Sequence, residues 1–116
     1  MPNEPLFDRR ALLDNLGEDV ELLQLMVRTF VDDTPRLIAE LRSALAQGDA
    51  PAAVRASHNV KGSAANFGAV PLVRFVSAME QTCRAGNLAT AAASLAEAER
   101  LIAALVAELR QELPGP

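Results

Sequence analysis

The sequence contains no tryptophan, no tyrosine and a single cysteine among its 116 residues. Without a second cysteine, an internal disulfide is excluded, and so is a zinc site built from several thiolates. A lone thiol is typical of a reducing compartment, so we expect a cytoplasmic location. The scarcity of aromatic side chains also argues against the stacking platforms that bind single-stranded nucleic acids.

Basic charge and long apolar runs are scarce as well. The formal net charge is −4 and the sequence pI is about 4.9, which argues against a nucleic-acid partner. No apolar run approaches the roughly 18 residues that cross a bilayer. The acidic start of the chain also lacks the basic region of a secretory signal. We therefore expect neither nucleic-acid binding nor membrane association.

Half of the residues are apolar, and alanine and leucine outnumber the β-branched residues. This composition favours helix along the whole chain. Glycine and proline cluster at a few positions and divide the chain into segments. The predicted elements are a short helix at about residues 8–16 and longer helices at about 19–47, 50–67, 71–85 and 88–113.

Pro35 falls inside the second segment, but the apolar spacing stays in phase on both sides of it. We therefore expect one bent helix there rather than two. The connections are short, which makes neighbouring helices antiparallel. The predicted fold is all-α, an antiparallel up-down-up-down four-helix bundle capped by the short first helix. It forms a single domain over residues 1–116, with an expected radius of gyration of about 13 Å.

The only histidine, His58, and the only lysine, Lys61, lie in the third predicted helix. Helical phase puts Val60 on the core face and His58 on the opposite, exposed face. Gly62 also falls on the exposed face, although glycine inside a helix costs about 1 kcal/mol relative to alanine. We interpret Gly62 as clearance for another molecule that approaches His58.

These residue types suit phosphoryl chemistry. An unperturbed imidazole, with a reference pKa of about 6.5, is a competent nucleophile at pH 7. A phosphoryl group bound to it carries nearly two negative charges, and Lys61 and Arg55 lie within about one helical turn of His58.

The motif His-x-x-Lys-Gly-Ser, followed by a glycine five residues on, resembles the signature of histidine-containing phosphotransfer (HPt) domains. It consists here of His58, Lys61, Gly62, Ser63 and Gly68. The N-terminal part of the chain, including residues 30–35 and 45–49, is also similar to the family. The resemblance therefore covers nearly the whole chain.

The resemblance implies that His58 is the phosphoacceptor and that Lys61 supports it electrostatically. Partner docking is expected at the side chains around them, and two further residues are expected to be structural. The docking residues are Val54, Arg55, Gly62 and Ala65, and the structural ones are Ser63 and Gly68. Two interpretations of Glu80 stay open, a polar neighbour of the histidine or a solvated carboxylate.

The expected function is a phosphorelay intermediate that accepts a phosphoryl group from the aspartyl phosphate of one receiver domain and passes it to the aspartate of another. A hybrid sensor histidine kinase is a further expected partner. The chain itself is expected to be a monomeric phosphocarrier and not an enzyme, with no cofactor or metal of its own. Mg²⁺ is expected on the receiver. The sequence leaves open which receivers are the partners and whether the domain is free-standing.

Two functions of other classes are alternatives to this one. A helical interaction bundle, such as an adaptor or chaperone, would make His58 incidental. A fragment of a helical hydrolase would need a second catalytic group, which the sequence does not offer near His58. Cys83 lies in phase with apolar residues of the fourth predicted helix, so we expect it to be a buried core residue.

Overall fold

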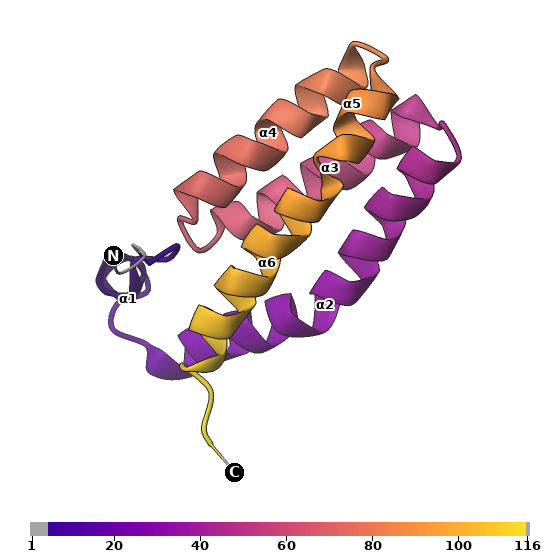
Figure 1. The fold of residues 1–116 in the computed structure, drawn as a ribbon. Helices are drawn as coiled ribbons and strands as arrows, with labels where there is room; N and C mark the ends of the chain where they lie inside the picture. Colours follow the sequence, from indigo (N-terminus) through magenta and orange to yellow (C-terminus); the bar gives the residue numbers. More distant parts are fainter. Residues whose placement is uncertain (1–4, 116) are drawn as a thin grey trace, which may run out of the picture.

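The computed structural model describes residues 5–115, which form six α-helices and no strand. The helices are α1 (Arg9–Asn15), α2 (Val20–Ala46), α3 (Ala50–Ala65), α4 (Val70–Arg84), α5 (Leu88–Ala93) and α6 (Leu95–Arg110). Three long helices and the α5–α6 pair run antiparallel to their chain neighbours and form a four-helix bundle (Figure 1). This confirms the predicted fold class.

Aspartates begin three of the helices. The side chains of Asp8, Asp19 and Asp49 accept hydrogen bonds from the backbone N–H three residues on, at 3.0–3.1 Å. Each satisfies a donor that the first turn of a helix leaves free. The turn after α3 contains Gly68 in the left-handed region at φ 63°, where glycine carries no steric penalty.

The second helix is continuous through Pro35, as the in-phase apolar spacing predicted. Proline removes one backbone donor and crowds the preceding turn, which bends a helix. The ribbon of α2 changes direction partway along its length (Figure 1). Its buried side chains still face the bundle on both sides of Pro35, among them Val27 and Leu41.

The last predicted helix, 88–113, is wrong in two respects. The structure interrupts it at Ser94, between α5 and α6, and ends it at Arg110. The Ser94 hydroxyl donates to the Thr90 carbonyl oxygen at 3.3 Å. The third helix was predicted to end at Phe67, but α3 ends two residues earlier, at Ala65.

The short helix α1 covers one end of the bundle. Phe67 contacts the rings of Phe7 and Phe30 edge-on, with centroid separations of 6.2 and 5.3 Å. The Glu108 carboxylate accepts from the backbone N–H of Leu6 at 2.8 Å. These contacts hold the segment before α1 against α3 and α6.

The bundle measures 42 × 29 × 26 Å and has a radius of gyration of 14.8 Å. This is larger than the predicted 13 Å or so, because that value describes a compact chain of this length and the bundle is elongated. None of the helices in residues 5–115 is long and apolar enough to cross a membrane.

Candidate functional site

His58 projects from the exposed face of α3. Its side chain is 62% exposed, while the adjacent Ser57 is fully buried and donates to the Ala53 carbonyl oxygen at 2.6 Å. The helix therefore fixes its inner face in the core and presents the imidazole outward, as helical phase predicted. Within residues 5–115 no protein group forms a hydrogen bond with Nε2 of this ring.

The other ring nitrogen faces a buried carboxylate. Nδ1 of His58 lies 3.5 Å from Oε1 of Glu80, a residue of α4 that is only 2% exposed. The ammonium of Lys61 lies 2.8 Å from the same oxygen, and a guanidinium nitrogen of Arg84 lies 2.6 Å from Oε2. Glu80 is thus a polar neighbour of His58, and its interpretation as a solvated carboxylate is wrong.

The two cations keep Glu80 ionised despite its burial. Hydrogen bonding and charge from Lys61, and then from Arg84, lower the pKa of Glu80 to about 2, although burial acts in the opposite direction. Both carboxylate oxygens are therefore acceptors at neutral pH. Oε1 is buried and lies 2.8 Å from the ammonium of Lys61 and 3.5 Å from Nδ1 of His58, so this one oxygen faces both side chains.

The predicted docking residues surround His58 on α3. Gly62, Arg55 and Ala65 are exposed, and Val54 is half-buried. A Cβ added at Gly62 would meet no atom within 4 Å, so the backbone there borders open space. Of the two residues predicted to be structural, Ser63 is half-buried and Gly68 lies in the turn that follows α3.

A hollow of about 290 Å³ lies against His58. Its walls include Arg55 from α3 and Arg84 from α4. With Lys61, three cationic side chains therefore surround the face of α3 that carries the imidazole. This surface suits an anionic group on the ring.

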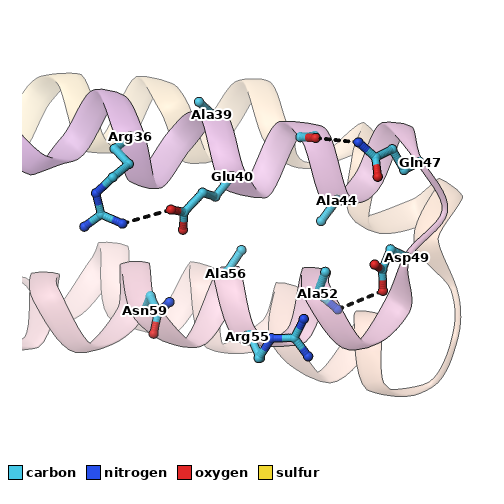
Figure 2. Close-up of a pocket in the computed structure, with 11 residues that line it drawn as sticks. Arg36, Ala39, Glu40, Ala44, Gln47, Asp49, Ala52, Arg55, Ala56 and Asn59 are labelled. Atoms are coloured by element: carbon cyan, nitrogen blue, oxygen red, sulfur yellow. Dashed lines mark hydrogen bonds and ion pairs between the residues drawn. The ribbon is translucent and has the colours of Figure 1, made fainter.

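A groove of about 470 Å³ lies farther along α2 and α3, toward the Gly48 turn. Figure 2 shows its walls, with the ion pair of Arg36 and Glu40 on α2 opposite Asn59 on α3. The groove does not include His58. It shares Arg55 and Asn59 with the hollow beside His58, so it adjoins the candidate site.

Residues 5–115 give no support to thiol chemistry at Cys83 or to a metal site. The thiol of Cys83 is 1% exposed, and its burial raises its pKa, as expected for a core residue. No cluster of three or more His, Cys, Asp or Glu side chains in this part of the chain could hold a metal ion.

The sequence prediction missed the burial of Glu80 and the part played by Arg84, although both had signals. Glu80 continues the four-residue spacing of Leu72 and Val76, which are fully buried, so helical phase alone places it toward the core. Arg84 follows Glu80 by four residues, the spacing at which opposite charges pair on a helix.

The comparisons with known proteins agree with this geometry. The family model described as "Hpt domain" matches residues 25–112. The chain belongs to the Hpt domain family. It is also similar to the crystal structure of histidine-containing phosphotransfer protein B (HptB) from Pseudomonas aeruginosa PAO1. That match has 31% identity and a TM-score of 0.85, and it covers 95% of this chain and 96% of that one. No match was found among curated protein sequences.

Membership of the family establishes the general role. Hpt domains carry phosphoryl groups on histidine in phosphorelays, and they interact with the receiver domains and kinases of two-component systems. They are phosphocarrier modules rather than catalysts.

Proposed function

We propose that His58 accepts a phosphoryl group from the aspartyl phosphate of one receiver domain and passes it to the aspartate of another. The observation that carries this proposal is the exposure of the only histidine, 62%, on a rigid helix beside the open position of Gly62. An exposed, fixed nucleophile with clearance around it is what an in-line attack on a bulky donor requires.

The transfer is a nucleophilic substitution at phosphorus. The lone pair on Nε2 of His58 forms the N–P bond while the P–O bond to the receiver aspartate breaks, and the electron pair returns to that carboxylate. The reverse step regenerates the imidazole. Nε2 is the nucleophile because it makes no hydrogen bond with the described residues, whereas Nδ1 faces Glu80.

Cationic side chains support the phosphorylated state. Lys61 is 26% exposed, and Arg55 lies in the wall of the hollow beside the ring. The phosphoryl group carries more negative charge than one carboxylate, so Lys61 can interact with it while Arg84 remains with Glu80. Charge-assisted contacts of this kind are roughly twice as strong as neutral hydrogen bonds.

We propose that receivers dock on the face formed by α2 and α3. Besides the small residues near His58, this face exposes apolar side chains of α2, with Leu25 59% and Leu22 39% exposed. A hollow of about 280 Å³ on the same face lies between Leu25 and the α3 residues Ser63 and Asn66. Exposed apolar area next to a reactive side chain is typical of a protein-binding surface.

In this proposal the receiver provides the Mg²⁺ and the charge stabilisation of the transition state. The domain itself is a monomeric carrier in the cytoplasm, and a hybrid sensor histidine kinase is a further partner. The buried, unpaired thiol of Cys83 is consistent with a reducing compartment.

The test is phosphoryl transfer from a panel of ³²P-labelled receiver domains. We expect acid-labile, base-stable label on the wild type and none on His58→Gln. Asn59→Gln changes a neighbouring exposed residue and serves as the matched control, which should still be labelled. Label retained by His58→Gln would contradict the assignment, and no label on the wild type from any receiver would favour an interaction bundle.

A further inference from the structure

Glu80 is the one buried acid in the part of the chain that the structure describes, and two cations neutralise it from different helices. The ammonium of Lys61 lies 2.8 Å from Oε1 and belongs to α3, so this contact crosses between two helices. A guanidinium nitrogen of Arg84 lies 2.6 Å from Oε2, and Arg84 follows Glu80 by four residues in α4. The contact of Arg84 is therefore local to one helix and does not depend on where Lys61 lies.

In the proposed function, the ammonium of Lys61 has two anionic partners at different stages. Before phosphorylation it contacts Oε1 of Glu80, which faces Nδ1 of His58 at 3.5 Å. After phosphorylation the new anionic group lies on Nε2, the ring nitrogen that does not face Glu80. The two anions lie at different nitrogens of the ring, so moving toward the phosphoryl group takes the ammonium away from the carboxylate.

That movement is costly unless another cation stays with the carboxylate. A buried charge that loses its only partner carries an uncompensated desolvation penalty, and such a penalty would keep Lys61 on Glu80. Arg84 removes this obstacle because its guanidinium stays on Oε2 when the ammonium leaves Oε1. Within residues 5–115, Glu80 is also the only carboxylate with which Arg84 forms an ion pair.

We propose that Arg84 is a positioning residue for phosphoryl transfer, which keeps Glu80 neutralised and so releases the ammonium of Lys61 to the phosphoryl group on His58. This inference rests on the proposed function of His58 as the phosphoacceptor. It goes beyond that function because it gives Arg84 an effect on the reaction that passes through two other side chains.

The position of Arg84 also offers a rival explanation. Its side chain lies in the wall of the hollow beside His58, together with Arg55. A guanidinium there can bind phosphoryl oxygens directly, and Arg84 would then act without Glu80. The two explanations differ in what happens when Glu80 loses its charge. Lys61 is then free whether or not Arg84 is present, whereas a direct contact of Arg84 with the phosphoryl group would remain.

The first test is the rate at which phosphoramidate phosphorylates His58, followed by ³¹P NMR. Nε2 forms its bond to phosphorus while the P–N bond of this small donor breaks and ammonia leaves with the electron pair. We expect Arg84→Met to lower the rate about fivefold, a size typical of coupling within one ion-pair network. A wild-type rate in Arg84→Met would overturn the proposal.

Two further variants show whether the charge at this position is the cause. Arg84→Lys should recover most of the rate, because an ammonium four residues after Glu80 can still pair with it. Failure of this variant to recover more than Arg84→Met would count against the proposal. Arg100→Met removes an arginine from the exposed ion pair with Glu97 on α6. It is the matched control and should react at the wild-type rate.

The second test repeats Arg84→Met in a Glu80→Gln background, where no buried charge holds Lys61. We expect no further slowing relative to Glu80→Gln alone, because Arg84 has no carboxylate left to neutralise. A slowing as large as in the wild-type background would show that Arg84 contacts the phosphoryl group directly, and the proposal would be wrong.

The third test needs no variant. Crystals of the wild type are soaked in phosphoramidate and cooled, and the phosphorylated domain is compared with the unphosphorylated one. We expect Nζ of Lys61 to contact a phosphoryl oxygen and to lie beyond the ~4 Å of an ion pair from Oε1 of Glu80, with Arg84 still on Oε2. Lys61 still paired with Glu80 beside a phosphorylated His58 would overturn this inference and leave the proposed function intact. A His58 that phosphoramidate does not modify would count against both.

Discussion

Lys61 and Glu80 form an ion pair at 2.8 Å that joins the exposed face of α3 to the buried face of α4. The family resemblance implied that Lys61 supports the phosphoryl group electrostatically. In the structure the ammonium already has an anionic partner, which is 2% exposed. Lys61 therefore has a structural role in the unphosphorylated domain as well as its proposed role in transfer.

This pair makes Lys61→Ala a destabilising change. The substitution leaves the buried carboxylate of Glu80 with Arg84 as its remaining ion-pair partner, and removing one partner of a buried polar group costs about 1–3 kcal/mol. We expect urea denaturation to show a loss of that size, together with slower phosphoryl transfer.

The double variant Lys61→Ala/Glu80→Gln is the control, because it removes the buried charge that Lys61→Ala leaves without its ammonium. We expect it to recover part of the lost stability. If Lys61→Ala unfolds at the wild-type urea concentration, the ion pair contributes nothing measurable and Lys61 is free to act on the phosphoryl group alone.

The lowered pKa of Glu80 also predicts how the free energy of unfolding depends on pH. Its pKa is lowered from 4.5 to about 2 in the folded protein, so the unfolded chain binds the proton more tightly than the native state does. The stabilisation is fully present above about pH 5 and is lost as the pH falls toward 2. A shift of this size corresponds to roughly 3 kcal/mol.

We expect Glu80→Gln to lose less stability than the wild type between pH 5 and pH 2, because a glutamine side chain does not titrate. Thermal melts of both proteins across this range, followed by circular dichroism, provide the measurement. Parallel curves for the two proteins would mean that other carboxylates account for the acid sensitivity.

His58 itself should contribute little to stability. Its side chain is largely exposed, and substitutions at such surface positions usually change the free energy of unfolding by less than about 0.5 kcal/mol. We expect His58→Gln to melt like the wild type while it loses all phosphoryl acceptance. A large drop in melting temperature would show that the contact of Nδ1 with Glu80 is needed for the fold.

The overall fold was predictable because local signals along the chain agree with one another. Apolar spacing, aspartate caps and glycine stops mark the same boundaries, and in-phase spacing across Pro35 correctly indicated one helix. The break at Ser94 was not predictable from the apolar pattern, because the alanine-rich stretch around it favours helix on both sides.

The candidate site was predictable only in part. Helical phase placed His58 and Gly62 on the exposed face of one helix, and those positions depend on local geometry alone. The arrangement of His58, Lys61 and Arg84 around one carboxylate depends on how α3 packs against α4. Spacing within a single helix does not show which side chains of two different helices come into contact. The four-residue spacing of Glu80 from Val76 did indicate that the Glu80 side chain faces the core.

Gly62 is the position where stability and function should respond in opposite directions. It lies inside α3, where alanine is favoured over glycine by up to about 1 kcal/mol, and an added Cβ would meet no atom within 4 Å. Gly62→Ala should therefore raise the melting temperature. Gly62→Gln should be neutral or slightly stabilising, because a longer side chain on this exposed face also extends into solvent.

Both substitutions should slow phosphoryl transfer from a receiver domain, although they do not destabilise the fold. Both substitutions place atoms one helical turn from His58, where a receiver must bring its reacting atoms to about 3–3.5 Å. We expect Gly62→Gln to lose transfer far more than Gly62→Ala, with both proteins folded. Phosphorylation by phosphoramidate, which is small enough to avoid the added side chain, should stay at the wild-type rate in both variants. If Gly62→Gln instead accepts the phosphoryl group from a receiver as fast as the wild type, the receiver does not approach over Gly62.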